Sequence, residues 1–231
     1  MLLSVEDLRV KYGAFEAVRG VSFELRAGEI LGIVGESGSG KSTIARTLAG
    51  LEKPSAGKIV RNCRRLQMIF QDAVGSLNPR MKIGAALDEA IKVGRPKTAP
   101  AITAPELLEQ VGLSRAVLDQ YPRELSGGQC QRVSVARALS CAPEVLIADE
   151  PVSALDVSVQ ARVLNLLRDL RRHLGISILL IAHDLAVVKN VCDRICVMEK
   201  GVFVDSGEAE AVFDHPLSDY TLRLLKAVPS I

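Results

Sequence analysis

The spacing of hydrophobic residues changes along the chain, and each change marks a different kind of structure. Apolar and polar residues alternate over residues 3–10 and 18–25, with a turn at Tyr12-Gly13 between the two segments. Strict alternation is typical of half-buried strands, so these segments predict an antiparallel pair. Two further strand-like segments, 57–60 and 66–70, follow a break at residues 53–57.

Other strand-like segments are mostly apolar, without alternation, and most of them are separated by helices. The apolar runs cover residues 29–34, 145–148, 176–181, 195–198 and 202–204. Helical spacing covers residues 43–49, 158–173 and 185–191. Strands that are apolar on both faces and alternate with helices form parallel sheets, so we predict an α/β fold with a mainly parallel sheet and an N-terminal antiparallel β subdomain.

The segment at about 73–140 has a different pattern, because helical and loop signals replace strand signals until residue 145. Thr103 and Glu106 form a capping box that predicts a helix start, and Ser126 is placed to cap another helix. We therefore expect a helical subdomain inserted into the α/β core.

The end of the chain is predicted to form one more helix. Four apolar residues, Leu217, Tyr220, Leu224 and Val228, fall on one face of it. A stripe at this spacing is typical of core packing.

Length and composition favour one folded unit spanning residues 1–231. The chain has 231 residues, of which 48% are hydrophobic and 24% charged, as in ordinary globular proteins. The net charge is only +2, and the pairs Arg64-Arg65 and Arg171-Arg172 are interpreted as solvent-exposed, so we expect no nucleic-acid partner.

No apolar run approaches the roughly 20 residues that span a bilayer, and the first residues lack the pattern of a signal peptide. The five cysteines lack paired CxxC spacing, which favours reduced thiols over a disulfide or zinc framework. We therefore expect a protein of the cytoplasm.

The strongest chemical signal is a glycine-rich loop between a predicted strand and a predicted helix. It fits the pattern G-x-x-x-x-G-K-[ST], in which backbone amides surround phosphates while a lysine adds charge and a hydroxyl binds Mg²⁺. The helix start adds its free amides and its partial positive charge. The residues assigned to this phosphate loop are Gly35, Glu36, Ser37, Gly38, Ser39, Gly40, Lys41, Ser42 and the first helical residue Thr43.

Two adjacent carboxylates, Asp149 and Glu150, end the buried strand at 145–148. The carboxyl end of such a strand borders the crevice where α/β sheets bind ligands. We expect Asp149 to hold Mg²⁺ together with Ser42, and Glu150 to act as the general base that activates water.

A second anion-binding helix start is formed by Ser126, Gly127, Gly128 and Gln129. One triphosphate hardly needs two such sites in one chain. We infer that two chains pack head to tail, each offering this turn to the γ-phosphate on the other's phosphate loop.

Taken in order, these motifs resemble the ATPase subunit of an ATP-binding cassette (ABC) transporter over essentially the whole length. Gln71 at a strand end, Ser153-Ala154-Leu155-Asp156 after the acidic pair, and His183-Asp184 after the next strand complete the resemblance. It implies a P-loop NTPase core that binds ATP and Mg²⁺.

The resemblance also implies roles for single residues. Tyr12 would stack on adenine, Gln71 would sense Mg²⁺ and the transmembrane partner, Asp156 would cross the dimer interface, and His183 would contact the γ-phosphate. Tyr12 as a turn aromatic, Gln71 as a plain strand end and His183 as a polar residue beside the sheet are the simpler alternatives.

A finer resemblance, to importers of oligopeptides, dipeptides and nickel, rests on residues 70–72, 76–80, 150–160 and 220–229. Residues 129–132 resemble the second of two unlike ATPase subunits, so a homodimer and a heterodimer both remain open. The chain is shorter between Gly57 and Gln71 than this group leads us to expect, and it lacks a longer C-terminal extension after Val228. The missing extension weakens a peptide assignment and leaves nickel open.

The resulting hypothesis is a Mg²⁺-dependent ATPase that drives a membrane permease from the cytoplasmic face of the inner membrane. An extracytoplasmic substrate-binding protein would take part indirectly. The alternatives are a soluble ABC ATPase that acts on DNA or ribosomes, and a nucleotide-binding regulator without turnover. The presence of both Glu150 and His183 argues against the regulator.

Overall fold

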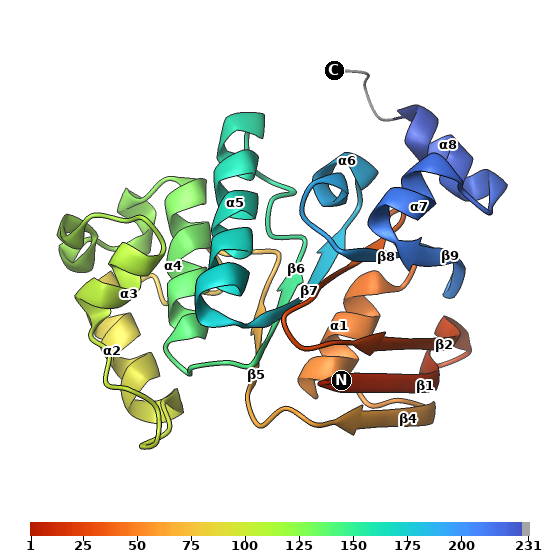
Figure 1. Ribbon diagram of the computed structural model, residues 1–231. Helices are drawn as coiled ribbons and strands as arrows, with labels where there is room; N and C mark the ends of the chain where they lie inside the picture. The colour runs from red at the N-terminus through yellow and green to blue at the C-terminus, as the bar shows by residue number, and fades with distance from the viewer. Residues whose placement is uncertain (228–231) are drawn as a thin grey trace.

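The computed structural model describes residues 1–227, and two sheets dominate its architecture (Figure 1). The strands are β1 (Leu3–Tyr12), β2 (Phe15–Leu25), β3 (Ile30–Val34), β4 (Ala56–Arg61), β5 (Leu66–Ile69), β6 (Val145–Asp149), β7 (Ser177–Ala182), β8 (Arg194–Glu199) and β9 (Val202–Glu208). The helices are α1 (Lys41–Ala49), α2 (Ile83–Gly94), α3 (Ala104–Gln110), α4 (Gly127–Leu139), α5 (Val157–Leu174), α6 (Leu185–Lys189), α7 (Ala209–Asp214) and α8 (Asp219–Ala227). Two 3₁₀ turns, η1 (Arg115–Asp119) and η2 (Pro122–Glu124), lie between α3 and α4.

The smaller sheet has the order β2-β1-β4 and is antiparallel, as the alternating pattern predicts. The larger sheet has the order β5-β6-β7-β3-β8-β9. Its strands β5, β6, β7, β3 and β8 are parallel, and only β9 pairs antiparallel, with β8. The predicted α/β fold with a mainly parallel sheet and an antiparallel β subdomain is confirmed.

Side chains from the larger sheet enter two separate cores because successive residues point to opposite faces. On one face, Leu146, Ala148, Ile178 and Leu180 pack with the helices α2 to α6. On the other face, the intervening residues of the same strands pack with α1 and the smaller sheet. The continuous apolar runs in the sequence therefore reflect burial on both faces.

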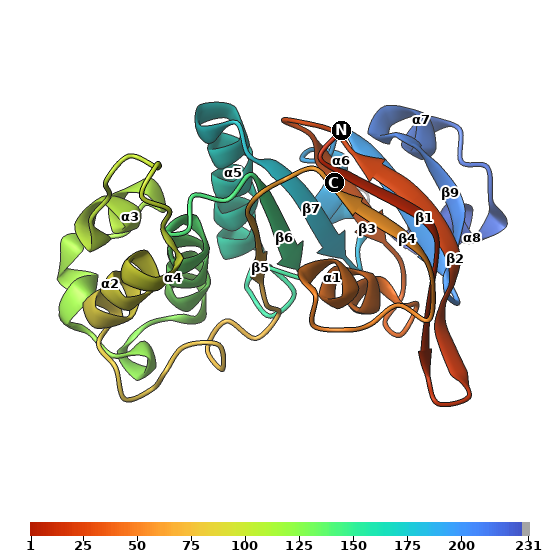
Figure 2. The same ribbon diagram turned by 90° about the horizontal axis from the view of Figure 1, so that it is seen from below.

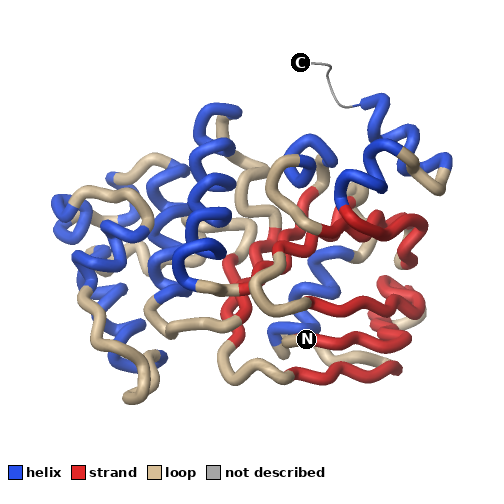
Figure 3. The backbone as a smooth tube through the Cα atoms, in the orientation of Figure 1, coloured by secondary structure: helices blue, strands red, loops and turns tan. Residues whose placement is uncertain are grey.

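The helices α2, α3 and α4 lie together at one end of the molecule, away from the smaller sheet (Figure 2). The chain leaves the sheet after β5, passes through these helices and returns in β6, which pairs directly with β5. The predicted caps are present, since Thr103 and Glu106 form a capping box at α3 and Ser126 caps α4. Colouring by secondary structure makes this all-helical portion distinct from the strands (Figure 3).

The C-terminal helix differs from the prediction. Tyr220 is buried and Leu224 is partly buried against the core, but Leu217 is 83% exposed and precedes α8. The prediction that Leu217 belongs to the core is therefore wrong, because the helix starts two residues later and the stripe begins at Tyr220. Val228 lies outside the described residues.

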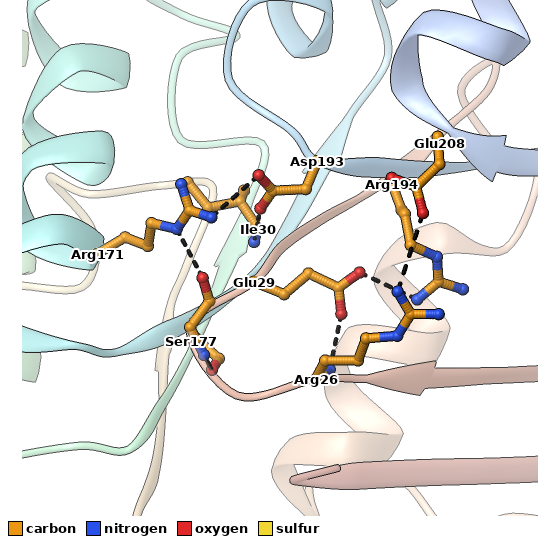
Figure 4. Close-up of polar contacts among 9 residues, drawn as sticks. Arg26, Glu29, Ile30, Arg171, Ser177, Asp193, Arg194 and Glu208 are labelled. Atoms are coloured by element: carbon orange, nitrogen blue, oxygen red, sulfur yellow. Dashed lines mark hydrogen bonds and ion pairs between the residues drawn. The ribbon is translucent and has the colours of Figure 1, made fainter.

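Polar contacts join the elements at the amino edge of the larger sheet (Figure 4). Arg171 of α5 donates to the carbonyl of Gly28 at 2.6 Å and pairs with Asp193 at 3.0 Å, while Arg194 pairs with buried Glu29 at 3.0 Å. The interpretation of Arg171 as merely solvent-exposed is wrong, because its guanidinium links α5 to the loop before β3. Arg65 is likewise tied to Glu144, at 3.1 Å.

Candidate active site

Loops from four neighbouring strands meet at the carboxyl edge of the larger sheet. The phosphate loop follows β3, Gln71 follows β5, Glu150 follows β6 and His183 follows β7. Because β5, β6, β7 and β3 are consecutive and parallel, their carboxyl ends lie side by side. Residues separated by more than 100 positions are thus brought to one place by strand order.

The phosphate loop requires close backbone approach at Gly40. Gly40 has a φ of 109°, which side-chain-bearing residues rarely adopt, and a Cβ there would clash with the carbonyl oxygen of Ala17. No side chain of residues 1–227 caps α1, which begins at the next residue. The first amides of α1 and its positive dipole end are therefore left to bind an anion.

Lys41 is buried, 3% exposed, and lies across the phosphate loop. Its Nζ donates to the carbonyl oxygens of Gly35 and Glu36, at 2.7 and 2.8 Å. Burial lowers the pKa of Lys41, and the nearby carboxylates of Glu150, Asp149 and Glu36 oppose this effect. The loop therefore holds a buried cation that phosphate oxygens would neutralise.

Two oxygen-bearing side chains, Ser42 and Asp149, meet at the start of α1. The Ser42 hydroxyl donates to Oδ1 of Asp149 at 2.8 Å. Burial raises the pKa of Asp149, and the hydrogen bond from Ser42 opposes that shift. Mg²⁺ prefers oxygen ligands and commonly takes one or two carboxylates plus substrate phosphates, so this donor set fits Mg²⁺.

Glu150 has a backbone conformation that aims its side chain across the site. Its φ is 45°, in a region that costs a non-glycine residue about 1–3 kcal/mol. The Glu150 Oε2 accepts from Nε2 of Gln71 at 3.1 Å and lies 3.6 Å from Nδ1 of His183. Glu150 is thus in contact with both Gln71 and His183, which favours a shared role over the simpler alternatives.

A cavity of about 450 Å³ joins these groups. Phe15, on the hairpin that carries Tyr12, also lines it, and the sequence reasoning missed this residue. The sequence feature that could have identified Phe15 is its position next to the turn predicted at Tyr12-Gly13. The predicted site residues that line the cavity are Tyr12, Glu36, Ser37, Gly38, Gly40, Lys41, Ser42, Thr43, Gln71, Glu150 and His183.

Gly35, Ser39 and Asp149 lie behind this lining. Ser39 is buried, and its carbonyl oxygen accepts the amide of Gly201 at 2.9 Å. A Cβ on Gly35 would clash with the carbonyl oxygen of Met198. These residues shape the loop from within.

The second predicted anion site lies apart from the phosphate loop. None of Ser126, Gly127, Gly128, Gln129 and Asp156 lines the cavity of the phosphate loop within residues 1–227. Gly127 lines a neighbouring cavity of about 460 Å³, which shares Gln71 and Glu150 with the first. Ser126 is exposed and caps α4, with its hydroxyl 3.3 Å from the Gln129 amide. The α4 start therefore faces outward, where another chain could meet it.

The chain carries no metal-binding cluster of three or more His, Cys, Asp or Glu side chains within residues 1–227. Over the same part of the chain, every helix is too short or too polar to cross a bilayer. All five cysteines are free.

Comparison with known proteins gives a consistent result. A family model described as ABC transporter matches residues 18–153. The chain is 44% identical over 260 residues to the oligopeptide transport ATP-binding protein OppF of Salmonella typhimurium, which covers 99% of this chain and 78% of that protein. It is 46% identical over 232 residues to OppF of Haemophilus influenzae, covering 93% of this chain and 70% of the relative.

Solved structures share the fold. CbiO1 of Clostridium perfringens, part of the transporter complex cbiONQ, matches with a TM-score of 0.80 and 28% identity over 93% of this chain and 91% of the other. A dimeric post-hydrolysis state of the ATP-binding cassette MJ0796, bound to ADP and Pi, matches with a TM-score of 0.75 and 26% identity over 90% of this chain and 99% of the other.

Proposed function

Because this chain belongs to the ABC transporter family, we propose that it is the ATP-hydrolysing subunit of an importer that takes up peptides. The observation that carries the proposal is the convergence of four loops on one cavity. A phosphate loop, an acidic pair, a glutamine and a histidine meet there, and phosphoryl transfer needs such positioned charges more than covalent chemistry.

In this proposal, Lys41 and the amides at the start of α1 bind the β- and γ-phosphates of ATP. Ser42 and Asp149, with the amide oxygen of Gln71, hold Mg²⁺. Bound there, Mg²⁺ would neutralise charge on the phosphate oxygens. Tyr12, 44% exposed at the cavity's rim, offers a flat surface for the adenine ring.

Glu150 is proposed as the general base. Its carboxylate is largely buried, and the contacts to Gln71 and His183 fix its position. His183 is half-exposed beside it and is proposed to contact the γ-phosphate. The proton of the attacking water would pass to Oε1 or Oε2 of Glu150.

Two chains are proposed to complete each site. Ser126, Gly127, Gly128 and Gln129 would bind the γ-phosphate held by the partner, and Asp156 would cross the interface. The exposed start of α4 supports this arrangement, as does the exposed Asp156, whose carboxylate makes no capping bond to α5 within residues 1–227.

Peptides are proposed as cargo because relatives at 44–46% identity are named as oligopeptide transport ATP-binding proteins. None of those relatives is named for nickel, so nickel is not favoured. We propose permease subunits as partners, the cytoplasmic face of the inner membrane as the location, and a substrate-binding protein as an indirect partner. The transport names likewise give no support to a soluble ATPase acting on DNA or ribosomes.

The substitution Glu150→Gln tests the catalytic assignment. It keeps the side-chain shape but removes the base, so ATP should still bind while hydrolysis falls by about 10²–10⁴-fold and a closed dimer accumulates. Hydrolysis is measured by phosphate release and the dimer by size-exclusion chromatography with ATP.

The matched control is Glu144→Gln, which makes the same change at the opposite end of β6 and should leave hydrolysis near the wild-type rate. A Glu150→Gln protein that hydrolyses ATP at the wild-type rate would show that Glu150 is not the base.

Lys41→Ala should lose nucleotide affinity, and unchanged binding in calorimetry would contradict the proposed phosphate site.

A further inference from the structure

A tyrosine from the last helix contacts the phosphate loop. Tyr220 lies on α8, and its hydroxyl oxygen accepts a hydrogen bond from the backbone amide of Glu36 at 2.9 Å. The Tyr220 side chain is buried, with only 5% of its surface exposed. Residues 184 positions apart thus meet at the loop that is proposed to bind phosphate.

The same loop residue is held from its other side by Lys41. The amide of Glu36 donates to Tyr220, while its carbonyl oxygen accepts from Nζ of Lys41 at 2.8 Å. The ammonium group of Lys41 is held by the carbonyl oxygens of Gly35 and Glu36, so the orientation of the Glu36 backbone contributes directly to where it lies. A shift of the Glu36 backbone would move the Lys41 charge relative to the phosphates.

The position of the hydroxyl is determined by the surrounding fold. Ser218 caps the start of α8 through the Thr221 amide at 3.0 Å, and the Leu217 amide donates to buried Asp205 of β9 at 2.8 Å. The guanidinium of Arg223 lies 5.7 Å from the centre of the Tyr220 ring. Both Figure 1 and Figure 2 place α8 beside α7 and β9. The hydroxyl is thus held by an anchored helix.

Burial raises the pKa of Tyr220, and the hydrogen bond from the Glu36 amide opposes the shift. The ordinary pKa of tyrosine is about 10, so the phenol stays neutral at physiological pH.

We propose that Tyr220 is a positioning residue for the nucleotide site, holding the Glu36 backbone so that Lys41 faces the phosphates. Tyr220 would not touch the reacting atoms, and α8 would affect nucleotide affinity through this one hydrogen bond. The inference rests on the proposed function, because it assigns a further residue to the same site.

Loss of the Tyr220 hydroxyl should weaken nucleotide binding. Without the hydroxyl, the Glu36 amide loses its partner and the loop populates other conformations. Apparent affinity falls in proportion to the population of the competent loop. Ground state and transition state use the loop alike, so KM for ATP rises while kcat changes little.

The substitution Tyr220→Phe tests this inference, because it removes the hydroxyl and keeps the buried ring. Binding of MgADP, measured by calorimetry on the full chain, should weaken about five- to tenfold. Hydrogen–deuterium exchange of residues 30–40, recorded without nucleotide, should become faster. The control on the same helix is Leu222→Ala, which truncates a side chain that is 40% exposed, keeps the Tyr220 hydroxyl and its anchors, and should leave affinity within about twofold of wild type.

Unchanged MgADP affinity in Tyr220→Phe overturns the inference, even if exchange is faster. It is also wrong if Leu222→Ala weakens binding equally, because the effect then comes from α8 packing in general. A wild-type chain that fails to bind MgADP would contradict the proposed function and this inference together. Unchanged affinity in Tyr220→Phe alone rejects only the role of Tyr220.

Discussion

At the scale of single residues, the site concentrates charge where water is scarce. Asp149 and Lys41 are each 3% exposed. Burial raises the pKa of Asp149 and lowers the pKa of Lys41, so in both cases it favours the neutral form. Burial of a charge lowers stability unless a partner compensates it. The folded chain therefore carries an electrostatic cost at this site that binding of Mg²⁺ and phosphate would relieve.

Asp149→Asn should stabilise the protein without nucleotide. The folded protein raises the pKa of Asp149, so it favours the protonated carboxyl. The stability gained from that proton is fully present below the ordinary pKa of about 3.9 and is lost as pH rises through the raised pKa. At pH 7 the ionised carboxylate therefore lowers the stability of the folded protein. Asparagine carries no charge and can still accept a hydrogen bond from Ser42, so it should raise Tm, by about 2–4 °C for each kcal/mol of stability gained. Calorimetric unfolding measures the change.

This gain should shrink as pH falls through the raised pKa of Asp149, because the wild-type carboxyl then regains its proton. Asp119→Asn is the control, because that side chain is exposed and should give no comparable gain. A lower Tm for Asp149→Asn at pH 7 would contradict the prediction. Whichever way its Tm changes, Asp149→Asn should lose ATP hydrolysis if Asp149 holds Mg²⁺.

At the scale of elements, the start of α4 combines a structural role with the proposed binding role. The Ser126 side chain caps the Gln129 amide, and the Gln129 side chain bonds back to the Ser126 amide at 2.8 Å. Gly128 allows α4 to approach α5, since a Cβ there would clash with Val159. The glycines of this turn therefore serve helix packing as well as anion binding.

Substitutions at Ser126 should separate the two roles. Aspartate is as good an N-cap as serine, so Ser126→Asp should keep the thermal stability, whereas its charge should repel the partner's γ-phosphate and abolish the ATP-dependent dimer. Ser126→Ala should lose about 1 kcal/mol from the cap. Thermal unfolding measures the effect on stability. Sedimentation with ATP, in chains that also carry Glu150→Gln, measures the effect on the dimer.

The control is Thr103→Ala, which removes the equivalent cap from α3 and should lower stability by a similar amount without affecting the dimer. Normal ATP-dependent dimerisation of Ser126→Asp would remove the proposed role of this turn.

At the scale of the whole molecule, no residue of the α4 turn lines the cavity of the phosphate loop within residues 1–227, and Gly127 lines a neighbouring cavity instead. A site completed by two chains predicts complementation between inactive variants. Lys41→Ala destroys the loop half and Ser126→Asp the turn half, so each variant alone should be inactive. A mixed dimer regains one intact site, because the loop of one chain meets the turn of the other.

Mixing the two variants should therefore restore a measurable part of the ATPase activity. The assay is phosphate release at constant total protein. A mixture of Lys41→Ala with Glu150→Gln is the control, since both changes fall in the same half-site and no intact site can form. Absence of recovery in the first mixture, with mixed dimers verified by differential tagging, would contradict the shared site.

Much of the local structure could be predicted from the sequence. The phosphate loop, the caps at Thr103 and Ser126, and the acidic strand end depend on residues within a few positions of one another. The alternating and continuous apolar patterns likewise identified the strands of both sheets. The hydrophobic pattern failed at Leu217, because periodicity cannot tell where a helix begins.

Local chemistry was therefore determined by the sequence alone, because turns, caps and anion-binding loops are made by neighbours along the chain. Only the tertiary structure decided which of these pieces meet. The strand order of the larger sheet brought Gln71 and His183 to Glu150. The packing of the smaller sheet brought Phe15 to the cavity, and the packing of α8 set Tyr220 against Glu36. Such contacts depend on the path of the whole chain through two packed cores, which no short pattern records.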